Sequence, residues 1–273
     1  MDRSHIMKRL TLLLTVLLLA SLACTLGATP ESTGEPVQPS PLPPVEESAA
    51  PLPPVDGNPP ALNADCGNVY IPVIPGASWT YSLSGPASDT YTHSILSVGQ
   101  ASFVEQDAFG SGVTRMGEWS CDRGNLTALN PGGGGATVNT EGLSSQFEAT
   151  SNSGVTFPAD PKPGDTWSQS VTLEGSQTIN GYNAPAKNQV NTTCTAIGME
   201  SVTVPAGTFE ALRVDCVIEM IISVNAGGNA FDTTLNTTSA TWYAPNVGMV
   251  KSVTIGNGLD STTELTSYSL PQQ

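Results

Sequence analysis

The chain has 273 residues, of which 24 are Asp or Glu and nine are Lys or Arg, for a formal net charge of −15 at pH 7. Such an acidic excess argues against a nucleic-acid partner and against adsorption on an anionic lipid surface. Charged residues make up only 12% of the chain, so most of its polarity comes from Ser, Thr and Asn, as in many secreted β proteins.

The first segment has the pattern of an export signal. A basic stretch at Lys8 and Arg9 precedes an apolar run, Leu10–Ala23, which is too short for the ~20 residues that span a bilayer. We therefore predict a signal peptide over residues 1–23. The string Ser-Leu-Ala-Cys that ends at Cys24 resembles a bacterial lipobox, which implies lipidation of Cys24 and a membrane-anchored, extracytoplasmic protein. An ordinary secretory signal with a chance cysteine is the alternative.

Residues 24–62 form a Pro-rich linker. The segment is dense in Pro, Glu and Ser and contains the near-repeats Pro41–Val45 and Pro51–Val55. Because it has little apolar surface to bury, we predict a solvated, polyproline-like spacer between the lipid anchor and the folded part. A proline-rich ligand for a partner domain is the alternative interpretation.

Residues 63–273 are predicted to form one antiparallel β domain. Helical periodicity is nearly absent here, and short strand-like runs are separated by Gly, Pro and Ser. Such spacing is typical of consecutive strands joined by hairpins. The predicted strands are Ser78–Leu83, Tyr91–Val98, Ser102–Gln106, Val113–Ser120, Leu126–Leu129, Gly142–Thr150, Thr166–Leu173, Gln189–Ile197, Ser201–Val204, Thr208–Val224, Phe231–Tyr243, Met249–Ile255 and Ser261–Ser269.

One hairpin stands out. Pro205 and Gly207 predict a three-residue loop with Val204 opposite Thr208. Four cysteines follow Cys24, and an even number after an export signal predicts two disulfides. Three pairings are possible, of which we favour Cys194–Cys216 across this hairpin together with Cys66–Cys121. The loop register alone would place Cys194 nearer Ile218, so a β-bulge near Gly198 is expected. A four-cysteine metal site is the alternative, but the spacing is wrong for zinc, and no metal is predicted.

Three motifs carry a family resemblance. They are Pro75-Gly-Ala-Ser-Trp79, Val204-Pro-Ala-Gly-Thr-Phe209 and Trp242-Tyr-Ala-Pro-Asn-Val-Gly-Met-Val-Lys251. Together they resemble a group of bacterial exported proteins and lipoproteins of unassigned function, some labelled TapB-like, over most of residues 70–268. The resemblance implies a large curved antiparallel sheet or incomplete β-barrel, similar to periplasmic lipoprotein carriers. A β-sandwich is the alternative fold. The resemblance implies no catalytic residues.

The usual catalytic patterns are missing from the sequence. After the signal peptide His93 is the single histidine, which excludes paired-histidine metal motifs, and no G-x-S-x-G elbow is present. We place His93 on a strand surface and predict a protein that is not an enzyme and has no cofactor. A paired-carboxylate glycosidase is a remote alternative, with candidates Glu105, Asp107, Glu118, Asp215 and Glu219.

The candidate ligand-contacting or rim aromatics are Trp79, Trp119, Trp167, Trp242 and Tyr243. Their apolar neighbours favour core or rim packing. Our first functional hypothesis is a lipid-anchored, non-enzymatic envelope or cell-surface protein. Its curved β domain would bind a small ligand, or a protein or glycan partner. An adhesive or structural surface module without a small-molecule pocket is the alternative, and a carbohydrate-active enzyme is a remote third possibility.

Overall fold

The computed structural model describes residues 65–86, 88–129, 137–140, 143–179, 182–226, 229–258 and 260–271. All of them belong to the unit Asp56–Gln273. The predicted signal peptide, the lipidation of Cys24, the linker and its boundary with the domain lie outside the described residues. No helix in the described part has the length and apolarity needed to cross a membrane.

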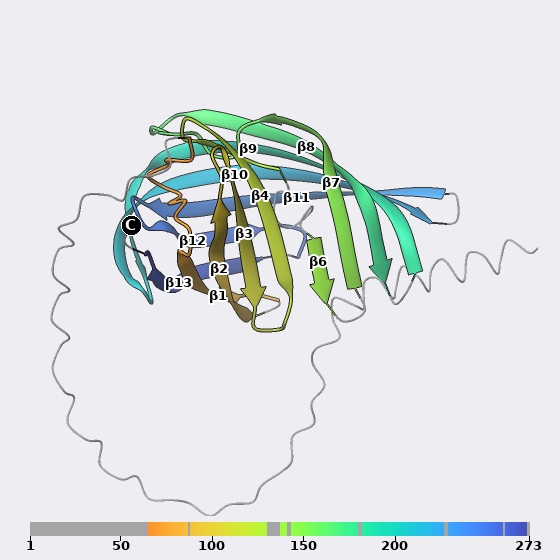
Figure 1. Cartoon of the computed structure of the whole chain (residues 1–273), viewed down its shortest axis with the longest axis horizontal. Coiled ribbons are helices and arrows are strands. Elements are labelled where there is room, and N and C mark those ends of the chain that lie inside the picture. The colour runs from red at the N-terminus through yellow and green to blue at the C-terminus, as the bar shows by residue number, and fades with distance from the viewer. Residues whose placement is uncertain are drawn as a thin grey trace, which may run out of the picture. The chain divides into compact units, whose positions relative to one another are not determined.

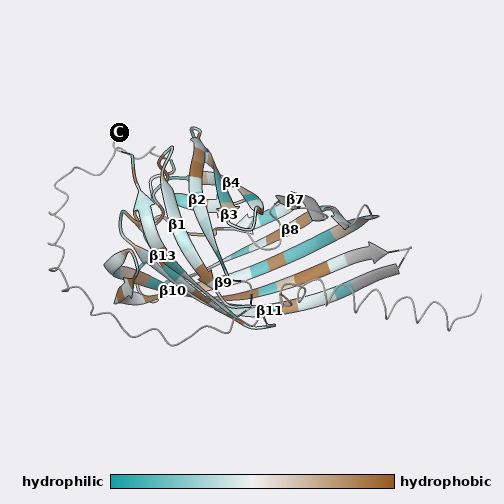
Figure 2. Cartoon of the chain, turned by 90° about the horizontal axis from the view of Figure 1, so that it is seen from below, coloured by the Kyte–Doolittle hydropathy of each residue, from teal (hydrophilic) through white to brown (hydrophobic). Residues whose placement is uncertain are grey.

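All the described strands belong to one antiparallel sheet (Figure 1). Apolar and polar side chains alternate along them, as the bands in Figure 2 show, so each strand turns one face inward. The strands are β1 Ser78–Ser84, β2 Asp89–Val98, β3 Ser102–Phe109, β4 Thr114–Asp122, β5 Asn125–Ala128, β6 Thr137–Thr140, β7 Leu143–Gly154, β8 Thr166–Ile179, β9 Tyr182–Val204, β10 Gly207–Ala226, β11 Asn229–Ala244, β12 Gly248–Ile255 and β13 Ser261–Ser269.

The sheet curves into a nearly closed barrel. Its strand order is β3-β2-β1-β13-β12-β11-β10-β9-β8-β7-β6-β4-β5, and β3 also pairs with β4. This extra pairing brings the two ends of the order together. The prediction of a curved antiparallel sheet or incomplete barrel is therefore confirmed, and the β-sandwich alternative is wrong because a sandwich needs two sheets.

At the point of closure, β4 divides its backbone pairing between two short strands. Thr114–Met116 of β4 pair with β6, whereas Trp119–Asp122 pair with β5. On the far side of β5, backbone hydrogen bonds join Leu126 to Thr156 and Phe157, and side chains supply further bonds. The Ala128 carbonyl accepts bonds from Asn152 Nδ2 at 2.9 Å and from Gln169 Nε2 at 2.8 Å. Side-chain bonds thus replace part of a backbone ladder between β5 and β7–β8.

The β9–β10 hairpin differs from its prediction in one respect. Val204 pairs with Gly207, not Thr208, so the loop has two residues rather than three. The expected bulge is present, because Arg213 pairs with Gly198 while Val214 pairs with Ala196. The two predicted strands on either side of Gly198 are therefore one continuous strand, β9. Residues of β6 were not predicted as a strand.

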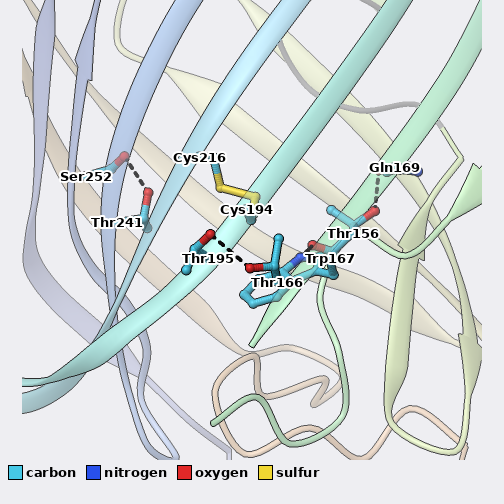
Figure 3. Close-up of a disulfide and its surroundings, with 9 residues drawn as sticks. All are labelled: Thr156, Thr166, Trp167, Gln169, Cys194, Thr195, Cys216, Thr241 and Ser252. Atoms are coloured by element: carbon cyan, nitrogen blue, oxygen red, sulfur yellow. Dashed lines mark hydrogen bonds between the residues drawn. A yellow bond between two sulfur atoms is a disulfide. The ribbon is translucent and has the colours of Figure 1, made fainter. Parts of the chain in front are cut away.

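The structure contains the two disulfides that the sequence favours. Cys194 and Cys216 lie directly opposite each other with Cα atoms 4.1 Å apart, and Cys66 is bonded to Cys121. Figure 3 shows the first bridge between β9 and β10, beside Trp167, whose register partner is Cys194. The second ties the segment before β1 to β4. That segment contributes buried Val73, Ile74 and Ala77 to the main core.

Candidate functional site

The site is built by the register of the first four strands, which lie side by side in Figure 1. Directly opposed residues share one face of a sheet. Trp79 on β1 faces His93 on β2, His93 faces Asp107 on β3, and Asp107 faces Arg115 on β4. We call these four residues together with Glu105 the charged row.

The charged row lies on the inner face of the barrel. Trp79, which opens the row, is only 3% exposed, and its register partners must point to the same side. The side chains of His93, Asp107 and Arg115 nevertheless keep 24%, 18% and 30% of their surface exposed. Charged groups on the buried face therefore still reach solvent, which is the requirement for contact with a ligand.

Asp107 is the shared counter-ion. Its Oδ1 lies 2.8 Å from His93 Nδ1, and its Oδ2 accepts a 2.8 Å bond from an Arg115 terminal nitrogen. Glu105 accepts a hydrogen bond from Trp119 but has no close counter-ion, because its Oε2 is 3.7 Å from His93 Nε2, which is beyond hydrogen-bond range. The Arg115 Nε is buried and has no hydrogen-bond partner among the described residues.

A glycine makes room for Glu105. Gly117 is its register partner on β4. A Cβ added there would lie 2.6 Å from Glu105 Oε1 and 2.8 Å from its Cγ. Glu105 therefore lies across the backbone of β4, and any larger residue at position 117 would displace it.

Aromatic rings surround the charged row. Tyr91 stacks between Tyr81 and Phe109 at centroid distances of 5.0 and 4.9 Å, and Trp119 stacks on Phe103 at 5.4 Å. The Arg115 guanidinium lies 4.8 Å from the Phe109 centroid, within the range of a cation–π contact. The charges are thus enclosed by rings rather than by other polar groups.

Burial and ion pairing shift the pKa values of the titratable groups in the charged row. Burial raises the pKa of Glu105, an effect partly opposed by His93. Burial alone would lower the pKa of His93, but the hydrogen bond to Asp107 and the charges of Glu105 and Asp107 outweigh it, so the net pKa is raised. For Asp107 burial is outweighed by its bonds and charge interactions with His93 and Arg115, which lower its pKa. The surroundings of His93 therefore favour its protonated form more than water does.

These shifts predict a pH dependence of stability. A raised His93 pKa stabilises the fold fully below the unfolded value of about 6.5, and this contribution is lost as the pH rises through the folded value. The raised Glu105 pKa acts in the same direction, while the lowered Asp107 pKa removes stability only in strong acid. We expect urea unfolding between pH 5 and 9 to show a decline on the alkaline side that His93→Gln reduces. Parallel curves for the two proteins would contradict this.

The structure gathers three of the five predicted aromatics at the charged row. Trp79 on β1 is part of the row, and Trp119 on β4 lies beside Glu105. Tyr243 reaches it from β11, and burial, with a further contribution from Glu105, raises the pKa of Tyr243 to about 12. Trp167 lies elsewhere in the core and donates a 2.9 Å bond to the Thr156 carbonyl (Figure 3). Trp242 is half-buried, lies over Arg213 and donates to Glu200.

His93 is the main correction among the candidate residues. We expected it on a strand surface, but its register with Trp79 turns it inward. Of the candidate carboxylates, Glu105 and Asp107 share the inner face, whereas Asp215 pairs with Arg213 and Glu219 accepts a 3.1 Å bond from Asn191. Glu118 is exposed. The described residues contain no group of three or more His, Cys, Asp or Glu arranged to hold a metal ion.

Comparison with known proteins gives limited family information. A model of the family described as DUF3108-like matches residues 149–270, which do not include the charged row. No protein with a curated description matches the chain. The TapB-like resemblance of the motifs stays a prediction.

Similar solved structures include three bacterial proteins. The first, from Bacteroides fragilis, is described as exported with a YmcC-like fold (TM-score 0.47, 16% identity, 74% of this chain and 99% of that one). A Parabacteroides distasonis protein is described as a lipoprotein (TM-score 0.46, 17% identity, 75% and 100%). The third is the hypothetical lipoprotein YmcC of Escherichia coli (TM-score 0.34, 10% identity, 72% and 86%).

Proposed function

We propose that this protein is an exported, lipid-anchored, non-enzymatic protein whose β domain binds a small ligand on its inner face. The observation that supports this most directly is the charged row. It places partly exposed His93, Glu105, Asp107 and Arg115 on a face that otherwise buries aromatic and aliphatic side chains. Ligand sites combine an apolar or aromatic lining with a few convergent polar groups in this way.

The energetic cost of the charged row supports the same interpretation. Removing an ion pair from water often costs more than the pair returns, and apolar residues of similar volume would stabilise a core as well or better. The other five Lys and Arg residues of the described part pair with acids outside this row. Arg115 alone is placed among the inner aromatics, so its charge is best explained by an interaction beyond folding.

A role in binding fits the charged row better than a role in catalysis. Asp107 already uses both oxygens, one on His93 and one on Arg115. It acts as a fixed counter-ion that sets the position of both cations, rather than as a free general base. Glu105 alone is left with spare acceptor capacity.

The binding proposal is tested by ligand-observed NMR on the full-length protein, with a mixture of small organic cations, anions, sugars and fatty acids. We expect at least one class to bind to the wild type; an anionic ligand should be lost in Arg115→Leu and a cationic one in Glu105→Gln. Thr193→Ala, a change in β9 away from the charged row, is the matched control. Equal binding in all four proteins, or none in any, would refute an inner-face site.

The anchor has its own test. If Cys24 carries the lipid, a Cys24→Ala variant should move from the membrane pellet to the soluble extracytoplasmic fraction, because several acyl chains hold a protein stably and none remains. Labelling with a radioactive fatty acid should be lost at the same time. Continued membrane association of the variant would contradict lipidation.

A second function, adhesion without a small-molecule pocket, is favoured by the outer face of β8–β10. Ser170 donates a 2.8 Å bond to Asn191, Asn191 donates to Glu219, and Thr166 bonds Thr195 across the same strands. Such polar ladders present hydroxyl and amide groups that can hydrogen-bond a glycan. Retention on immobilised polysaccharide that falls in Asn191→Ala but not in Arg115→Leu would support this function instead.

A further inference from the structure

We propose, on the basis of the inner-face site above, that the ligand is an organic cation: an amine, a guanidinium or a quaternary ammonium group. It binds between Glu105 and the surrounding aromatic rings, and its binding displaces the proton of His93. The inference goes beyond ligand binding in general, because it fixes both the charge of the ligand and its competition with a proton.

The charge count of the row supports a cation. With His93 protonated, the two positive groups, His93 and Arg115, balance the two carboxylates, Glu105 and Asp107. When His93 is neutral, the row has one negative charge in excess, on a face enclosed by rings. A buried charge without a partner is costly, so the row requires one positive charge, which either a proton or a ligand supplies.

Glu105 is the group that would pair with the ligand. Asp107 already holds two partners at 2.8 Å, whereas the nearest cationic nitrogen to Glu105 is His93 Nε2 at 3.7 Å. The Glu105 side chain is 22% exposed and occupies the space that is left open because Gly117 has no side chain. An incoming ammonium group thus finds an accessible carboxylate that lacks a close counter-ion.

The walls of the site already accommodate positive charge. Arg115 lies 4.8 Å from the Phe109 ring centroid and His93 lies 5.4 Å from that of Trp79. Aromatic faces attract cations through their quadrupole, and several rings together form the cages that hold quaternary ammonium groups. Tyr91 and Trp119 are half-buried and supply further faces.

His93 is the group that exchanges its proton. The other titratable groups in and around the charged row are Tyr81 on β1, Tyr91 on β2, Glu105 and Asp107 on β3, Arg115 on β4 and Tyr243 on β11. The three tyrosines have pKa values raised by burial and stay neutral. Asp107 stays charged, and Arg115 does not deprotonate. Protons that compete with the ligand therefore bind to His93 or to Glu105, whose pKa is raised by burial, and the His93→Gln variant separates the two.

The test is isothermal titration of the full-length protein with choline at several pH values between 5.5 and 8.5. The neutral tert-butyl isostere of choline, 3,3-dimethylbutan-1-ol, is titrated in parallel. We expect choline to bind and the isostere to bind at least tenfold more weakly. Below the pKa of His93, choline affinity should fall by up to about tenfold per pH unit, since one proton competes with one cation. His93→Gln should flatten this profile, and Glu105→Gln should abolish choline binding. Glu210→Gln, which changes an exposed carboxylate on β10, is the matched control and should leave binding unchanged.

The outcomes separate this inference from the proposal it rests on. Equal binding of choline and the isostere contradicts a cationic ligand, and a flat pH profile in the wild type contradicts displacement of the His93 proton; either result leaves an inner-face site intact. Binding of an anion or sugar in the NMR mixture, lost in Arg115→Leu while choline does not bind, has the same meaning. If no probe binds in either experiment, both proposals fail.

Discussion

Replacing Cys66 and Cys121 with Ala is expected to destabilise the protein more than replacing Cys194 and Cys216. In the chain-entropy model the stabilisation grows with the length of the closed loop, giving about 4 kcal/mol for the 55-residue separation and about 3 kcal/mol for the 22-residue one. The shorter bridge joins residues that are already register partners in a long hairpin. The longer one joins segments that share no strand pairing.

Packing increases the difference. Cys66 begins a segment that Asn68 fixes through both ends of its amide: Nδ2 donates to the carbonyls of Gly124 and Pro158 at 2.9 Å, and Oδ1 accepts from the Tyr70 amide at 2.9 Å. Without the bridge, this segment is held by such bonds and by apolar contacts alone. Its release would expose the core next to β4.

Urea unfolding of the two double variants, with disulfides intact in the parent protein, measures the difference. The expected order is wild type, then the Cys194/Cys216 variant, then the Cys66/Cys121 variant. A limited-proteolysis experiment should show early cleavage before β1 only in the last of them. The reverse order of stabilities would mean that native strain or residual structure in the unfolded chain, rather than loop length, decides the contribution.

Much of the fold was predictable because strand alternation is local. Runs such as Tyr91–Val98 and Ser261–Ser269 can be predicted as strands from their own residues, and nearby Pro and Gly indicate where strands end. Closure of the barrel was not predictable, because it depends on the pairing of β3 with β4 and on the division of β4 between β5 and β6. Both are set by packing across the whole sheet.

The charged row was missed because His93 was read alone. Its meaning depends on registers that place Asp107 and Arg115 beside it, and one-residue shifts in register turn every side chain to the other face. A signal did exist. Along β3, Phe103, Glu105, Asp107 and Phe109 occupy alternate positions, so the two carboxylates lie on the same face as two aromatic rings. Acidic residues in phase with buried aromatics indicate an inner-face site, whereas isolated ones indicate solvent.

The two carboxylates of the row should respond in opposite ways to mutation, and this is the second large effect we expect. Asp107→Ala leaves both His93 and Arg115 without their shared acceptor on a largely buried face. Breaking a fully buried pair costs 3–5 kcal/mol, and partial exposure reduces this to about 2 kcal/mol. Glu105→Gln removes a charge that burial already disfavours, as the raised pKa shows. Its stability at pH 7 should equal or exceed that of the wild type.

The pair of variants separates folding from binding in one experiment. Thermal and urea unfolding at pH 7 should place Asp107→Ala well below, and Glu105→Gln at or above, the wild type. The same Glu105→Gln protein should lose choline binding, so the variant would be stably folded but unable to bind the ligand. If Glu105→Gln were as destabilising as Asp107→Ala, Glu105 would have to be a structural partner of His93 despite the 3.7 Å separation. The charged row would then stabilise the fold even though aromatic rings surround it, and no ligand would be needed to explain its presence.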